Sequence, residues 1–140
     1  MEKQCILFLC TGNSARSQMG EGFLRHYAGD RFEVHSAGLE PKGINPYTIR
    51  VMDEVGIDIR SQTSDSVRKY MGFMHFNYAI TVCSDADNNC PHALWSRGVK
   101  LHWPFDDPAT IEGTEDEKLA KFREVRDQIS AKVQMWLKVI

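Results

Sequence analysis

The sequence predicts an α/β fold, with a four-stranded parallel sheet in the strand order 2-1-3-4 and helices on both faces of the sheet. Apolar segments short enough to be strands alternate with segments that repeat at helical spacing. The first apolar segment is continuous, as expected for a strand that is buried on both faces. The chain has 140 residues, enough for the core of a single domain over residues 1–140.

The first half of the chain predicts two strands, each followed by a helix. Residues 4–10 form the continuous apolar strand, and residues 32–36 form the second strand. Between them, a polar loop leads into a helical pattern that Gly29 ends. Asn45-Pro46 begins a second helix, because Asn is a good helix cap and Pro suits the first helical position; Gly56 ends it.

The second half predicts a short helix after Ser64, two more strands over residues 78–82 and 99–102, and a long final helix. Thr114 and Glu117 have the spacing of a capping box at the start of this last helix. Its apolar residues recur at helical spacing, and we interpret them as core packing rather than as a cofactor site. They are Leu119, Phe122, Val125, Ile129, Val133 and Trp136.

The strand order brings two distant cysteines to one edge of the sheet. Strands 1 and 3 are neighbours in this order, and ligands bind beyond the carboxyl ends of the strands where the chain reverses direction. Cys10 ends the first strand and Cys83 follows the third. Neighbouring strands lie about 4.8 Å apart, so both thiols are expected near one site.

Composition excludes several classes of function. The formal net charge is −2 and no basic run is present, so neither nucleic acid nor a membrane surface is an expected partner. No segment is long and apolar enough for a membrane span or a signal peptide, so we expect a cytoplasmic protein. In that compartment the four cysteines are expected to be reactive or metal-binding thiols rather than permanent disulfides.

An oxyanion-binding loop is predicted between the first strand and the first helix. The segment fits C-x5-R-S, with Cys10 and Arg16 at its ends. Backbone amides of a loop wrapped around a helix start bind anions, Arg16 can hold two oxygens of a tetrahedral anion, and positive surroundings favour the Cys10 thiolate. Alone, the match could equally be a buried cysteine and a surface arginine, but the strand, helix and polar residues around it favour the site. The loop residues are Thr11, Gly12, Asn13, Ser14, Ala15, Arg16 and Ser17.

Asp107 is the candidate general acid. It follows the fourth strand and precedes Pro108, which restricts its backbone and directs its side chain. Asp-Pro is also a common turn signal, and taken alone that interpretation would be preferred. The anion loop at the same end of the sheet favours the acid.

Cys83 and Cys90 are predicted to form a thiol–disulfide relay with Cys10. They lie in what is predicted to be a polar, mobile loop beside the anion loop, whereas a phosphatase needs only one nucleophilic cysteine. Inert thiols and a metal site that includes His92 are the alternatives, but the C-x6-C spacing is wide for structural zinc, and no metal site is predicted. Cys5 lies inside the first apolar strand, where a passive core role is expected.

Three segments together resemble the thioredoxin-coupled arsenate reductases, which share the fold of the low-molecular-weight protein tyrosine phosphatases. They are residues 10–19 (CTGNSARSQM), 82–91 (VCSDADNNCP) and 105–109 (FDDPA). The resemblance extends over nearly the whole chain. It departs from the family at Ala15, where many members have another cysteine, and at Pro104, where glycine is common.

The resemblance implies a cascade of three thiols that reduces arsenate to arsenite. Cys10 would attack arsenate, held by Arg16, while Asp107 protonates the leaving oxygen. Cys83 would then form a disulfide with Cys10 as arsenite leaves. Cys90 would attack Cys83, which gives a Cys83–Cys90 disulfide and frees Cys10. Thioredoxin would reduce the Cys83–Cys90 bridge.

The same resemblance sets expectations for ligands and partners. Phosphate or sulfate should compete with arsenate, no cofactor is required, and a monomer is expected. Potassium is a candidate ligand near Asn13, Glu21, Ser36 and Asp65, although Gln62 nearby is a variable position that makes cation dependence doubtful. The rival functions are a low-molecular-weight tyrosine phosphatase and a non-enzymatic oxyanion or arsenite sensor.

One constraint follows from the chemistry of the two bridges. Cys83 belongs to both disulfides, so they cannot coexist, and each needs α-carbons within about 7 Å. The segment 83–90 is therefore expected to move between redox states and to be locally unstable.

Overall fold

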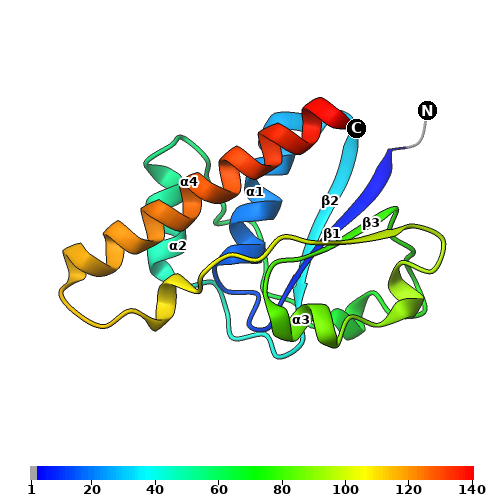
Figure 1. The fold of residues 1–140 in the computed structure, drawn as a ribbon, viewed down its shortest axis with the longest axis horizontal. Helices are drawn as coiled ribbons and strands as arrows, with labels where there is room; N and C mark the ends of the chain where they lie inside the picture. Colours follow the sequence, from blue (N-terminus) through cyan, green and yellow to red (C-terminus); the bar gives the residue numbers. More distant parts are fainter. Residues whose placement is uncertain (1–2) are drawn as a thin grey trace.

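Four parallel strands form the centre of the computed structural model, which describes residues 3–140 (Figure 1). They are β1 (Gln4–Cys10), β2 (Phe32–Gly38), β3 (Tyr78–Thr81) and β4 (Val99–His102), in the order β2-β1-β3-β4. The predicted order and strand direction are thereby confirmed. Leu9 lies opposite Ala37 on one side and Thr81 on the other, so the carboxyl ends of the inner strands are level.

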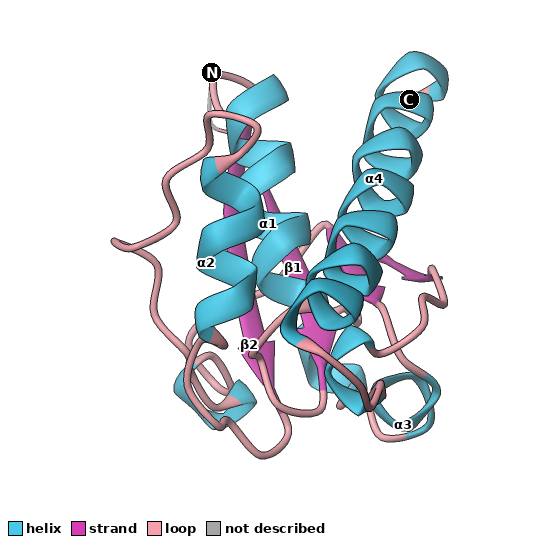
Figure 2. Cartoon of the chain, turned by 90° about the vertical axis from the view of Figure 1, so that its left-hand side faces the viewer, coloured by secondary structure: helices cyan, strands magenta, loops and turns pink. Residues whose placement is uncertain are grey.

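Three longer helices cover one face of the sheet, as Figure 2 shows. They are α1 (Arg16–Ala28), α2 (Pro46–Asp53) and α4 (Glu115–Val139), and α4 packs against both of the others. The short helix α3 (Ser84–Asn88) lies beyond the carboxyl ends of the strands (Figure 1). None of the helices over residues 3–140 is long and apolar enough to cross a membrane.

The core explains why β1 is apolar without interruption. Residues 6–9 are completely buried. Phe8 meets Trp103 and lies so close to Gly20 of α1 that a Cβ there would come within 2.7 Å of its ring. On the opposite face, His35 of β2 contacts Tyr70 and Phe76, whose segments cover the sheet where no long helix does.

The caps at the starts of α2 and α4 agree with the sequence prediction. The Asn45 side chain accepts a hydrogen bond from Tyr47 N, and Pro46 is the first residue of α2. Thr114 and Glu117 form the full capping box at the start of α4.

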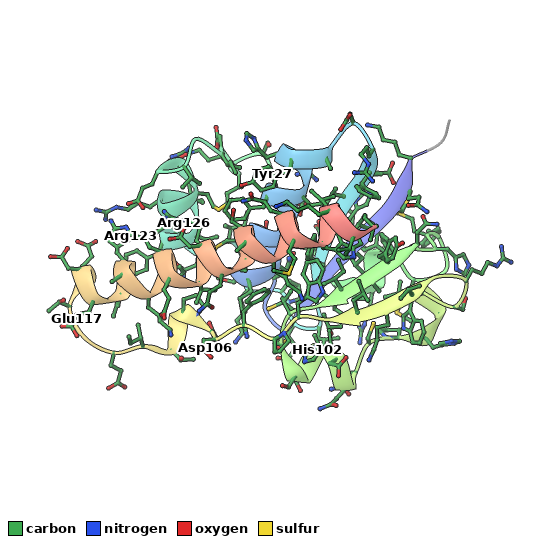
Figure 3. The ribbon with its side chains drawn as sticks, turned by 45° about the horizontal axis from the view of Figure 1, so that its top comes forward. Tyr27, His102, Asp106, Glu117, Arg123 and Arg126 are labelled. Carbon is green, nitrogen blue, oxygen red and sulfur yellow. The ribbon has the colours of Figure 1, made fainter. Side chains whose placement is uncertain are left out.

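From α4, Arg123 and Arg126 reach Glu54 at the end of α2 (Figure 3) and hold the pKa of that carboxyl at about 2.

Two local predictions differ from the structure. The segment after Ser64 contains only a single 3₁₀ turn, Val67–Lys69, because the exposed residues around it offer no continuous apolar side. The segment between Cys83 and Cys90, expected to be a loop, contains α3, and Cys83 is buried at its start. The Cys83 sulfur accepts a hydrogen bond from Ala86 N in the first turn of this helix, and Asp85 in the same turn suits its positive end.

Candidate active site

The loop between β1 and α1 has its carbonyl groups turned outward. The carbonyls of Cys10, Thr11, Gly12 and Ser14 accept hydrogen bonds from backbone amides of residues 39–45, at 2.8–3.1 Å. In residues 3–140, the amides of residues 12–15 have no backbone acceptor. Since a peptide's N–H and C=O point in opposite directions, these amides face the other side, where an oxyanion would bind.

Asn13 holds the loop in this shape. It is completely buried and has a positive φ of 47°, the left-handed conformation that Asn tolerates better than most residues. Its amide nitrogen donates to Ser17 Oγ (2.8 Å) and Ser36 Oγ (2.9 Å), and its oxygen accepts from Asp65 N (2.8 Å). The side chain therefore joins the loop to α1, β2 and the segment before the 3₁₀ turn.

A cavity of about 290 Å³ lies over the loop. Cys10, which is only 3% exposed, lies at its base. Arg16 donates to Phe105 O (3.1 Å) and lies 3.6 Å from Asp107 Oδ2. Loop residues, a guanidinium and a carboxyl group thus surround one space, as the sequence predicted. Its lining is Cys10, Thr11, Gly12, Ser14, Ala15, Arg16, Lys42, Asp107 and Ala109.

Asp107 is oriented as expected for a residue that precedes proline. Its backbone is extended, with φ −79° and ψ 109°. One carboxylate oxygen accepts a hydrogen bond from Ala109 N (3.0 Å), and the other faces Arg16. The turn and the acid were alternatives in the sequence: the structure shows the turn, which directs the carboxyl toward the cavity, and the role as acid stays a prediction.

The thiols of Cys10 and Cys83 lie side by side, close enough for Cys10 to donate a hydrogen bond to Cys83. Cys83 Sγ also lies 3.4 Å from Thr11 Oγ1 and 3.4 Å from Ala86 N, the amide at the start of α3. These contacts, first of all the one from Cys10, lower the pKa of Cys83 to about 5, and Arg16 contributes. The same hydrogen bond and burial raise the pKa of Cys10, against the effect of Arg16.

The two thiols therefore titrate together, and their contact lowers the pKa of Cys83 while it raises that of Cys10. The sequence argument placed the thiolate on Cys10, which stays a prediction. The positive surroundings are those predicted, but they act on two sulfurs, and Cys83 has more hydrogen-bond donors around it.

We expect the ultraviolet absorbance of one thiolate to be present at pH 7 and to disappear as the pH falls through about 5. The sign follows from the lowered pKa of Cys83, whose thiolate persists above that value. Cys83→Ser should abolish the transition. Cys10→Ala should move it to higher pH, because the main donor is lost. A transition kept in Cys83→Ser and lost in Cys10→Ala would place the thiolate on Cys10 instead.

Comparison with known proteins gives the family. Residues 5–140 match the low molecular weight phosphotyrosine protein phosphatases. The chain belongs to this family. It is 49% identical to an arsenate reductase of Shouchella clausii over 96% of this chain and 95% of the relative.

Solved structures of the same fold include an arsenate reductase in an oxidized state. It is 32% identical, has a TM-score of 0.80 and is matched over 94% of each chain. A thioredoxin-dependent arsenate reductase of Corynebacterium glutamicum is 26% identical with a TM-score of 0.60, over 95% of this chain and 63% of that one.

Lys42 is a residue of the cavity that the sequence analysis missed. Its backbone N–H donates to Gly12 O (2.9 Å), and its stem lies beside Gly12. The signal was available: Lys42 is a cation three residues before the predicted helix cap Asn45, in the connection that must pass the anion loop. The sequence pattern alone did not show the path of this connection past the anion loop.

We expect Lys42→Met to raise the KM for the anion by about fivefold, which corresponds to about 1 kcal/mol for a solvent-exposed charge. The kcat should change little, because an exposed cation at the rim attracts substrate and transition state alike. Steady-state kinetics at low and high salt measures both effects. A KM that is unchanged at low salt would remove Lys42 from the binding site.

The four residues of the candidate potassium site come together, but their carboxylates already have cationic partners. Glu21 accepts from Ser36 Oγ (2.5 Å) and pairs with Arg25 (2.5 Å). Asp65 pairs with Lys69 at 3.3 Å. Gln62, the variable position, accepts from Arg25 (3.1 Å) and donates to Gln18.

Proposed function

We propose that this protein reduces arsenate to arsenite by a relay of Cys10, Cys83 and Cys90. Its similarity to arsenate reductases over nearly the whole chain supports the reaction. One observation carries the mechanism: a second cysteine, Cys83, lies beside Cys10, which lines the anion cavity, because both lie at the carboxyl ends of neighbouring strands. A phosphatase has no use for a second thiolate at that place.

The first step is attack by Cys10 on arsenate held by the loop amides and Arg16. The Cys10 proton passes along the hydrogen bond to Cys83, which leaves Cys10 as the nucleophile. Asp107 protonates the departing oxygen, which leaves as water. The product is a Cys10–arsenic(V) adduct.

The second step begins when Cys83 gives the proton that it received to water, and the Cys83 thiolate then attacks the sulfur of this adduct. A Cys10–Cys83 disulfide forms and the sulfur–arsenic bond breaks. Its electron pair stays on arsenic, which leaves as arsenite, now arsenic(III). The approach is short, because the two cysteines follow the adjacent strand positions Leu9 and Thr81.

The third step is attack by Cys90 on Cys83, which frees Cys10 and creates the Cys83–Cys90 disulfide. A dithiol donor suits an internal bridge of this kind, and we propose thioredoxin, as in the thioredoxin-dependent relative. Such chemistry needs a compartment that keeps thiols reduced, so we place the protein in the cytoplasm. One chain holds the whole relay, and we propose a monomer.

We propose that no added cation is needed. Arg25 and Lys69 neutralise Glu21 and Asp65, the carboxylates that would otherwise hold potassium. Arsenate reduction should therefore proceed at the same rate in potassium, sodium and choline salts of equal ionic strength. Arg25→Gln should create a dependence on potassium, because it leaves Glu21 without its partner. A rate that falls in choline for the unmodified protein would contradict this.

The test of the function is arsenate-dependent consumption of reduced thioredoxin with one arsenite formed per disulfide. Phosphate and sulfate should inhibit competitively, since they fit the same loop. Slow hydrolysis of a phenyl phosphate is expected as a side reaction, because Cys10, Arg16 and Asp107 also suffice for phosphoester chemistry. Phosphatase turnover without arsenite formation would favour the phosphatase, and arsenite binding without turnover would favour the sensor.

A further inference from the structure

Trp95 has a buried polar atom without a partner. Its Nε1 is the single buried side-chain nitrogen or oxygen in residues 3–140 that has no hydrogen bond. Buried donors are nearly always paired, because leaving one unpaired costs free energy. The exception therefore calls for a functional explanation.

Trp95 lies beside the last cysteine of the proposed relay. It follows the 3₁₀ turn His92–Leu94, which begins two residues after Cys90. Its ring packs edge-on against His92, with ring centroids 4.6 Å apart. Cys90 and Trp95 are both partly buried against the core. The indole N–H faces the Cys90 sulfur without making a well-formed hydrogen bond to it.

The charged groups that face Cys90 oppose one another. Lys100 of β4 favours its thiolate and Asp87 of α3 disfavours it, and the two are paired at 2.6 Å. Burial has the largest effect and raises the pKa of the Cys90 thiol. Besides this ion pair, the indole N–H is the group in contact with Cys90 that favours the charged form.

We propose that Trp95 is a positioning residue for the second disulfide exchange: its indole N–H holds and stabilises the Cys90 thiolate as this sulfur attacks Cys83. The inference rests on the proposed function and deepens it. Cys90 first loses its proton to water. A Cys90–Cys83 bond forms, the Cys83–Cys10 bond breaks, and its electron pair leaves on Cys10 as a thiolate.

In the thiol form, Cys90 is a weak hydrogen-bond acceptor, so a bond from the Trp95 indole N–H contributes little stability. In the thiolate form, the same donor makes a charge-assisted hydrogen bond. The unpaired atom in the reduced protein is thus understandable: its partner exists only during the exchange. Trp95 would then speed the step that regenerates Cys10 and leave arsenite release unaffected.

Trp95→Phe tests this, because it removes the N–H and keeps a ring against His92. A rise of about one unit in the Cys90 pKa lowers its thiolate fraction tenfold, and higher intrinsic nucleophilicity recovers about threefold. The exchange should therefore be about threefold slower at pH 7, and above both pKa values the variant should be about threefold faster, because only the higher nucleophilicity then remains. Single-turnover reactions with arsenate and no donor, quenched by alkylation and mapped by mass spectrometry, follow both disulfides.

The matched control is Trp136→Phe, which also removes one indole N–H. Trp136 packs on Phe32 and Tyr78, at the end of the sheet away from the three cysteines of the relay. This variant should exchange at the rate of the unmodified protein. The first-turnover release of arsenite should be equal in all three proteins and shows that each is folded. Its absence in every protein would refute the proposed function instead.

A Trp95→Phe protein that exchanges at the unmodified rate throughout the pH range overturns the role of Trp95. A slowing by the same factor at every pH also overturns it, since lost packing does not depend on the Cys90 charge. A second measurement is the pH dependence of Cys90 alkylation in the reduced proteins. The midpoint should be higher in Trp95→Phe by about one unit, and equal midpoints contradict the proposal.

Discussion

Cys83→Ser should lose arsenate reduction by roughly 10³-fold or more, as expected when a nucleophile is removed. Serine can still accept the Ala86 amide at the start of α3, because its hydroxyl is a good helix cap. The fold should therefore survive. Without the Cys83 thiol, a Cys10–arsenic adduct has no neighbouring sulfur to displace it, and arsenite is not released.

Phosphatase turnover should respond in the opposite way. The hydrogen bond that Cys10 donates to Cys83 is the largest cause of the raised pKa of Cys10, and its loss should make Cys10 easier to ionise. Hydrolysis of p-nitrophenyl phosphate should therefore persist in Cys83→Ser or increase near neutral pH. The two activities, measured on one preparation, separate the relay from the anion site.

Cys5→Ser is the matched control for this substitution. Cys5 donates to Glu33 at 3.3 Å, near the start of β1, and a serine hydroxyl can make the same contact. Both activities should be retained. Arsenite formation by Cys83→Ser at the unmodified rate would mean that Cys90 or the donor attacks the adduct directly, and the proposed order of thiols would be wrong.

The strand order could be predicted because the sequence segments that specify it are long or have clear start residues. The continuous apolar segment of β1, the Asn45-Pro46 start of α2 and the capping box of α4 each specify their element locally. Once strands 1 and 3 are neighbours, the meeting of Cys10 and Cys83 follows from topology. Hence both the fold and the position of the site were accessible from sequence.

Features that depend on contacts between distant segments were not accessible. α3 has only five residues, mostly polar, and its start is capped by a cysteine rather than by a residue with strong capping preference. The charge on Cys83 depends on donors from Thr11 and Cys10, which are far away in sequence. The same holds for Lys42, whose place at the cavity is set by hydrogen bonds between the anion loop and residues 39–45.

The prediction that segment 83–90 moves becomes specific in the structure. Cys83 caps α3, and Cys90 lies two residues beyond its last residue. The five residues of α3 between them extend about 7.5 Å at 1.5 Å each, whereas the α-carbons of a disulfide lie about 4.4–6.8 Å apart. The Cys83–Cys90 bridge therefore requires α3 to unwind. The Cys10–Cys83 bridge spans neighbouring strands and leaves α3 in place.

We expect hydrogen exchange to reveal this difference. The amides of Asp87 and Asn89, bonded to Cys83 O and Asp85 O in the reduced protein, should exchange about 100-fold faster after one turnover with arsenate. Such an increase is moderate because a single helical turn has little stability of its own. Mass spectrometry of peptides covering residues 84–90, before and after the turnover, measures it.

Cys90→Ser provides the control, since its turnover stops at the Cys10–Cys83 disulfide. Its α3 amides should stay as protected as in the reduced protein, while the amides of α4 should be unchanged in every state. Equal protection of α3 in all states would mean that the second bridge forms without unwinding, against the geometry. The pairing of Asp87 with Lys100 must also break as α3 opens. Once this ion pair is broken, it no longer opposes the unwinding of α3, which exposes the Cys83–Cys90 disulfide to its reductant.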